Sequence, residues 1–234
     1  MDKEVALKAI SRMINKSVIH RYLDPGEALG EALFGLIMAL TFGVGARIVT
    51  AKDELDAHQL IAAAIGCNVA WGVIDATLYV LGSLFYRSQR ARFFRALKSA
   101  RSETEALAAI QDEFGLEDEP LAIQPDDRTL LYASILALSS HSTLARVRIR
   151  PRDFLSALLV FALVSATALP GVIPFLLLKD SYLALRLSNV VLILLLFLVG
   201  YWWGHYTEAR PWRVGATVMV LGLSMVFVAV ALGG

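Results

Sequence analysis

Five long apolar stretches, separated by polar segments, make up most of the chain. A helix rises about 1.5 Å per residue, so about 20 apolar residues cross a hydrocarbon core of about 30 Å. Each stretch is at least about that long. They run over Ala28–Thr50, Leu60–Phe85, Phe154–Leu178, Tyr182–Tyr206 and Val214–Leu232. The pattern predicts an all-α polytopic membrane protein with five transmembrane helices and a helical cytoplasmic insertion between the second and the third.

The insertion is too polar to enter a bilayer and divides into five expected parts. These are a basic helix that continues the second span, an acidic helix, a proline-containing loop, a third helix and a basic collar: Arg90–Ser102, Glu103–Phe114, Glu117–Asp127, Asp127–Ser140 and Arg146–Arg152. Ser102 and Glu105 have the spacing of a capping box, and Gly115 is expected to end the acidic helix.

These elements predict four regions. Residues 1–25 form a cytoplasmic amphipathic N-terminal helix, 26–85 the first two transmembrane helices, 86–152 the insertion and 153–234 the last three transmembrane helices. Apolar residues recur every three or four positions between the N-terminal basic residues, which is typical of a helix lying on an anionic membrane surface. A solvated N-terminal helix is the alternative.

Composition and charge agree with a membrane protein and orient it. Hydrophobic residues make up 57% of the chain and charged residues 18%, with a mean hydropathy of +0.60; soluble domains have about 45–50% and about 25%. Of the 22 Lys and Arg residues, 18 lie in the N-terminal segment, in Tyr86–Asp153 and in Thr207–Arg213. Because Lys and Arg collect on the cytoplasmic side, we expect a cytoplasmic N-terminus and an outside C-terminus, in a bacterial inner membrane.

Several side chains in the first two spans are not needed for crossing the bilayer. Glu27 and Glu31 are about 40° apart on a helix, and Met38 projects within about 20° of Glu31. Asn68 and Asp75, seven positions apart, share a face of the second span. An intramembrane carboxylate is costly and tends to face a pathway or a partner. The five residues therefore predict a cation pathway, with Glu31 and Asp75 as metal ligands. Hard oxygen ligands together with the one soft thioether of Met38 suit a borderline metal such as Fe²⁺ or Mn²⁺.

Each of these residues also has a structural interpretation. Asn68 and Asp75 are of the residue types that form interhelical hydrogen bonds to aid assembly. Glu27 follows Asp24–Pro25 and is expected at the membrane surface, where a charged carboxylate has a small desolvation cost. An acidic side chain there also stabilises the N-terminus of a helix. Met38 is of a type that fills gaps in packing.

The acidic residues of the insertion form a second candidate metal site. Oxygen ligands hold divalent cations, and Glu103, Asp112 and Glu113 are the candidates on the acidic helix. A solvated acidic surface that pairs with nearby arginines is the alternative.

Small residues and prolines predict how the spans pack. Gly26, Gly30, Gly35, Gly66, Ala70 and Gly72 allow the first two helices to approach other backbones closely. Pro170 and Pro174 remove helical hydrogen bonds and predict a kink or break in the third span. The single cysteine, Cys67, excludes an internal disulfide.

Motifs for enzymatic chemistry are not found in the sequence. It has no Walker-type phosphate loop and no Cys-x-x-Cys pair, and its four histidines are scattered. We expect no enzyme activity, no permanently bound cofactor and no nucleic-acid partner. The basic segments favour membrane lipid as a partner.

The order of two spans, a polar helical insertion and three further spans resembles the vacuolar iron transporter family. The segments that carry the resemblance are Arg87–Gln89, Leu169–Leu177, Ala184–Asn189, Leu196–Gly200 and Pro211–Gly215. It implies a homodimer that moves Fe²⁺ or Mn²⁺ out of the cytoplasm in exchange for protons, along a path between the first spans of the two subunits.

The chain departs from the family pattern in its first two spans. The family has an Asp-Gly pair shortly after Phe-Gly, whereas here Phe34–Gly35 is followed by Leu36–Ala39, with Met38 near the expected acid. The family's Gly-Glu-Tyr is replaced by Gly82–Leu84. The chain is thus expected to be a divergent prokaryotic-type member in which Glu31 and Asp75 substitute for the missing acids. A membrane scaffold or sensor that retains the fold without transport is the alternative.

Overall fold

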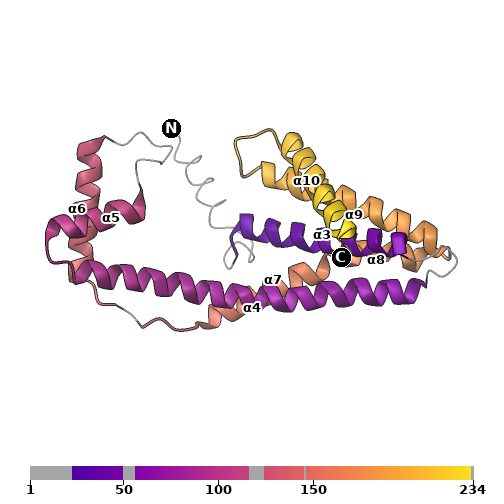
Figure 1. Cartoon of the computed structure of the whole chain (residues 1–234), viewed down its shortest axis with the longest axis horizontal. Helices are drawn as coiled ribbons and strands as arrows, with labels where there is room; N and C mark the ends of the chain where they lie inside the picture. Colours follow the sequence, from indigo (N-terminus) through magenta and orange to yellow (C-terminus); the bar gives the residue numbers. More distant parts are fainter. Residues whose placement is uncertain (1–22, 50–55, 116–123, 145, 233–234) are drawn as a thin grey trace, which may run out of the picture. The chain divides into compact units, whose positions relative to one another are not determined.

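Every element that the computed structural model describes is a helix. It describes residues 23–49, 56–115, 124–144 and 146–232 (Figure 1). Within these ranges five helical segments are long and apolar enough to cross a membrane, which confirms the predicted spans. They are α3 (Pro25–Val49), α4 (Ala57–Lys98), α7 (Pro151–Ala166) with α8 (Leu169–Leu177), α9 (Ser181–Gly204) and α10 (Pro211–Ala231). Most of the predicted N-terminal helix, up to residue 22, lies outside the described residues.

The chain divides into two compact units. The membrane unit contains the spans up to Val80 and from Pro151 onward, and the insertion unit is Leu81–Arg150. The boundary falls within α4, which continues without interruption to Lys98, as the basic extension of the second span predicted. The insertion unit also contains α5 (Glu103–Phe114) and α6 (Pro125–His141).

Helix α9 is the centre of the membrane unit and packs against α10, α3 and α8. A cluster of buried side chains joins α3, α9 and α10: Leu36, Ala39, Leu40, Leu192, Leu196 and Val226. Glycines bring α9 and α10 together, because a Cβ on Gly200 would lie 2.6 Å from the Cβ of Val218. Asp180 caps α9 by accepting hydrogen bonds from the backbone N–H groups of Tyr182 and Leu183, at 2.9 and 3.1 Å.

The third span is broken, as its prolines predicted. Helix α7 ends at Ala166 and α8 begins at Leu169, so that Pro170 lies in the first turn of α8. At the break the N–H of Ala168 bonds to the carbonyl of Ser165 at 3.4 Å. The carbonyl of Val164 thereby loses its normal i+4 donor and accepts instead from the N–H of Thr167 at 3.3 Å. A carbonyl oxygen has two lone pairs, so it can also accept hydrogen bonds from side chains.

The insertion unit has its own small apolar core. Leu97 of α4, Ala106 and Ile110 of α5 and Tyr132 of α6 are buried together. The bounds of α5 match the prediction, with Ser102 Oγ accepting from the N–H of Glu105 at 3.2 Å. Gly115 ends the helix with a φ of +48°, in the left-handed region that favours glycine.

The predicted start of α6 was wrong by two residues. The loop was expected to extend to Asp127, but Pro125 is already the first helical residue. Proline is well suited to this position, because its fixed φ is helical and its missing N–H would have no partner in the first turn.

Candidate ion pathway in the membrane unit

Asn68 is the most buried polar residue in the first two spans. Its side chain is fully enclosed, and its Nδ2 donates to the carbonyl of Gly35 at 3.0 Å. It also lies 3.2 Å from the carbonyl of Val164 and 2.9 Å from Thr167 Oγ1. The Thr167 hydroxyl in turn donates to the Val164 carbonyl at 2.6 Å. One amide of α4 thus joins α3 to the broken end of α7.

Glycines permit this close approach of backbones. A Cβ on Gly35 would collide with Thr167 Oγ1 and lie 3.1 Å from the Val164 carbonyl. A Cβ on Gly72 of α4 would lie 2.9 Å from Ser165 Oγ and 3.0 Å from the Phe161 carbonyl of α7. The predicted close contacts are therefore confirmed for Gly35 and Gly72. The prediction was wrong for Gly66, because a Cβ added there would meet no described atom within 4 Å.

Asp75 lies on the same face of α4 as Asn68, about 10 Å further along the helix. Tyr79 and Trp71 flank it by one turn and pack with Leu23, which precedes α3, and with Ala28 of α3 and Val160 of α7. Val73 and Leu81, which are more than half exposed, project about 160° and about 120° away from Asp75 around α4. Asp75 therefore points toward α3 and α7. Its Oδ2 is buried and has no hydrogen-bond partner among the described residues.

Glu31 of α3 lies close to Asp75. Since Asn68 faces Gly35 and the two helices run in opposite directions, the register places Asp75 opposite the segment between Ala28 and Glu31. Electrostatic repulsion accordingly reaches the half-buried carboxyl group of Glu31 from both Asp75 and Glu27. Neither Glu31 nor Asp75 forms an ion pair with any residue in the described part of the chain.

The other two predicted pathway residues lie at opposite ends of this set. Glu27 is exposed in the first turn of α3, where its Oε2 accepts from the N–H of Asp24 at 3.4 Å. That position agrees with a surface role at the helix N-terminus. Met38 is half-buried about 10 Å beyond Glu31 along α3. In order along the helix axis the set is Glu27, Asp75, Glu31, Asn68 and Met38.

The acidic residues of α5 are not brought together. Glu103 is the first residue of the helix, and Asp112 and Glu113 are near its end, about 14 Å away along the axis. Among the described residues, no three His, Cys, Asp or Glu side chains are placed to hold one metal ion. Cys67 is a free thiol, half-buried in α4.

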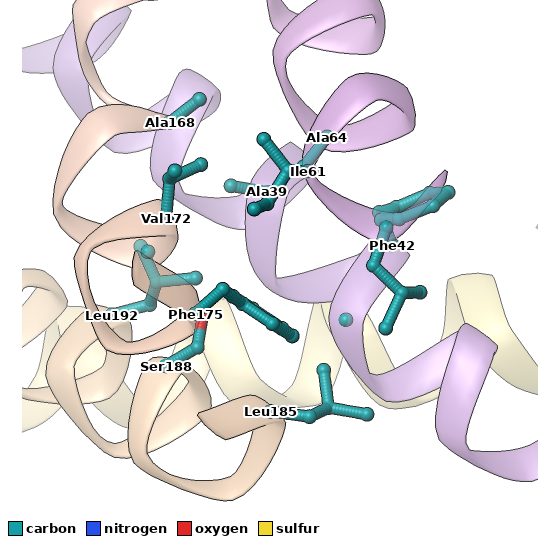
Figure 2. A pocket seen from close by; sticks show the side chains of 13 residues that line it. Ala39, Phe42, Ile61, Ala64, Ala168, Val172, Phe175, Leu185, Ser188 and Leu192 are labelled. Carbon is teal, nitrogen blue, oxygen red and sulfur yellow. The ribbon is translucent and has the colours of Figure 1, made fainter. Parts of the chain in front are cut away.

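A small cavity between α3, α4, α8 and α9 is apolar. Its volume is about 20 Å³, enough for about one water molecule. Figure 2 shows that its wall is built from aliphatic and aromatic side chains such as Phe42, Val172 and Phe175, with the hydroxyl of Ser188 as a polar exception. Neither Glu31 nor Asp75 lines this cavity.

Sequence reasoning missed Thr167 and the Val164 carbonyl as the partners of Asn68. The sequence indicated these acceptors only in part: Pro170 and Pro174 predicted a break in the third span, and a break frees carbonyl groups for other donors. Its exact place depends on Thr167 and Ala168, which lie before Pro170 and carry no turn signal of their own. Asn189 Oδ1 and Ser165 Oγ are further buried polar atoms without a hydrogen-bond partner in the described structure.

The comparisons with known proteins identify the family. The sequence model of the VIT family matches residues 83–234, which include the insertion and the last three spans. The candidate pathway residues of α3 and α4 all lie before the matched region. No curated protein matches the chain. Because the family match covers more than half of the sequence, the chain belongs to the vacuolar iron transporter (VIT) family, whose members are membrane transporters of metal ions and not enzymes.

Proposed function

We propose that this protein carries a divalent transition metal, Fe²⁺ or Mn²⁺, out of the cytoplasm in exchange for protons. The observation that carries the proposal is the pair Glu31 and Asp75, two membrane carboxylates that lie close together without an ion-pair partner in the described structure. Two unpaired carboxylates in a bilayer are unfavourable in the absence of a cation or protons. A divalent ion supplies the missing charge.

A homodimer completes the ligand set. Octahedral coordination by about six oxygens is typical of Mn²⁺, and one chain offers two intramembrane carboxylates. A second copy doubles that number when the path runs between the first spans of the subunits. Asn68 Oδ1, which is buried without a partner among the described residues, is a further oxygen on the same face of α4.

The two carboxylates also couple transport of the metal to transport of protons in the opposite direction. When the metal leaves, Glu31 and Asp75 become two neighbouring negative charges, and protonation relieves their repulsion. A metal ion moving one way and protons moving the other therefore compete for the same oxygens. The orientation proposed from the Lys and Arg distribution places the Glu27 end of the path at the cytoplasm of a bacterial inner membrane.

The exposed acids of the insertion have a less specific role in this proposal. Since Glu103 is far from Asp112 and Glu113 along α5, these side chains raise the local cation concentration rather than form one coordination site.

Flux measurements test the proposal. The full chain is reconstituted into vesicles that contain a metal-sensitive dye and a pH-sensitive dye. We expect Mn²⁺ or Fe²⁺ to enter with counterflow of protons, and Asp75→Asn and Glu31→Gln each to reduce flux about tenfold or more. Glu208→Gln, which removes an exposed acid outside the path, is the matched control and retains full flux.

A non-transporting scaffold or sensor predicts a different result. One observation favours a scaffold or sensor. Every candidate pathway residue lies before residues 83–234, the part of the chain that the family model matches. Vesicles with correctly folded protein but no flux of any tested metal would support this second function and exclude transport.

A further inference from the structure

Another cavity, which is polar, lies within the insertion unit, where α4 continues beyond the predicted membrane span. Its volume is about 400 Å³, within the range of small-ligand sites. One wall is the α4 segment with Ser88, Ala91 and Arg95, and the other is the segment after α6 with Leu144, Arg146 and Val147. The candidate ion pathway uses none of these residues.

The two walls are held together by a contact at one end of the cavity. Lys98 Nζ, one turn beyond Arg95 on α4, donates a hydrogen bond to the backbone carbonyl of Ser142. Leu97 of the same turn is buried against α5 and α6. Ser142, which follows α6, thereby lies beside the end of α4, and the cavity is lined from both of these parts of the insertion unit.

The described residues that line the cavity give it a positive charge. Arg95 and Arg146 are contributed by different walls, and none of the described lining residues is acidic. Neither arginine forms an ion pair with a residue in the described ranges, and Arg95 Nε alone bonds to its own helix, at the Ala91 carbonyl 3.2 Å away. Two guanidinium groups that line one cavity match an anion that accepts several hydrogen bonds, and the planar fork of arginine fits the oxygens of a phosphate group.

Measured along α4, the residues that line the cavity lie just past the expected end of the second span. Ser88 is about 5 Å and Arg95 about 15 Å past the expected end of the span at Phe85, measured along α4. The polar layer on each side of the hydrocarbon is about 5–8 Å thick. Arg90 lies over the ring of Tyr86, 5.7 Å from its centroid, which is typical of residues at this interface.

We infer that the cavity lined by Arg95 and Arg146 is a binding site for a phosphate group, carried either by an anionic lipid headgroup or by a soluble phosphate. The guanidinium groups hold the phosphate oxygens from two sides, and Ser88 and Val147 bound the space around it. Occupancy joins the segment before the third span to the end of the second span through the ligand.

The test measures phosphate binding to the full chain without any transition metal, so it is independent of transport. The protein is placed in phosphatidylcholine nanodiscs, and binding is measured by thermophoresis with two probes. One probe is inorganic phosphate, and the other is short-chain phosphatidylglycerol. Arg95→Gln and Arg146→Gln are compared with Arg92→Gln and Arg148→Gln, which remove exposed arginines of the same two segments from outside the cavity.

We expect Arg95→Gln and Arg146→Gln each to weaken binding of at least one probe about tenfold or more, with the two controls within about twofold of the unchanged protein. Arg95→Lys, which keeps the charge and loses the planar fork, should give an intermediate loss. Binding of the lipid alone identifies a headgroup site, and binding of inorganic phosphate identifies a soluble ligand.

Two results would overturn the inference. One is the absence of saturable binding of both probes to the unchanged protein. The other is an equal loss in all four Gln variants, which would reveal general attraction to a basic surface. Elution volume and melting temperature are measured for each variant, and because both arginines are exposed these should not change. Loss of metal flux would not affect either reading.

Discussion

The side-chain amide of Asn68 donates a hydrogen bond to the backbone carbonyl of Gly35, 3.0 Å away in the neighbouring transmembrane helix. Gly35 has no side chain to separate the helices at this point, and the same amide reaches Thr167 at the break of the third span. This junction sets the register of α3 against α4. The register in turn places Asp75 beside Glu31, so a structural residue positions the proposed pathway.

Replacement of Asn68 by leucine should destabilise the membrane unit. The change removes the donor to Gly35, Val164 and Thr167 and leaves the buried Gly35 carbonyl without this partner, at a cost of about 1–3 kcal/mol. Unfolding of the purified protein by SDS in mixed micelles measures the loss. Asn189→Leu is the matched control, since Asn189 Oδ1 has no partner in the described structure and its removal should cost less. Equal losses would contradict the assigned role of Asn68.

Gly35→Ala and Gly66→Ala should have opposite effects on stability. The added methyl group at position 35 collides with Thr167 Oγ1 and separates the helices, at a cost of about 1–3 kcal/mol. At position 66 nothing lies within 4 Å of the added methyl group. Alanine should there stabilise α4 by about 0.5–1 kcal/mol through its higher helix propensity. The same SDS titration compares them, and a neutral Gly35→Ala would show that the two backbones are not in close contact.

Asp75→Asn should separate stability from function. The buried Oδ2 has no partner in the described residues, so neutralising the carboxylate removes repulsion with Glu31 and no ion pair. We expect resistance to unfolding equal to or greater than that of the unchanged protein, together with loss of metal flux. Reduced stability in this variant would mean that Asp75 makes a structural interaction and would weaken its assignment to the path.

Ser102→Ala should loosen α5 locally. Ser102 Oγ caps the N–H of Glu105, while Glu105 Oε2 accepts from the N–H of Arg101 at 2.9 Å. Loss of the cap should cost about 1 kcal/mol. Hydrogen exchange of the full chain should then be about fivefold faster for the first-turn amides of α5, with α9 unchanged. Ser140→Ala, an exposed change near the end of α6, serves as the control.

Much of the fold was predictable because bilayer thickness and local chemistry determine it. The five spans follow from apolar length, and the bounds of α5 follow from Ser102, Glu105 and Gly115. The break in the third span follows from Pro170, although its exact position depends on Thr167. The start of α6 was misplaced because Pro125 was assigned to the loop before the helix, whereas it is the first helical residue.

The candidate site was less predictable because it depends on register between helices. Helical periodicity placed Asn68 and Asp75 on one face of α4 but did not indicate which residues they face. Asn68 holds three helices together by hydrogen bonds, which was the structural alternative for this residue. Glu103, Asp112 and Glu113 are close in sequence, but a helix of 12 residues places the first far from the others.

The bonds of Asn68 also impose an order on biogenesis. Its acceptor in Val164 is 96 residues later in the chain, so at a synthesis rate of about 5–20 residues per second the amide waits about 5–20 s for that part of the nascent chain. During this interval α3 and α4 are in the membrane while the Asn68 amide lacks its acceptors Val164 and Thr167. A nascent chain that has not yet reached the third span lacks two of the three acceptors, so only the Gly35 carbonyl is then available to the Asn68 amide.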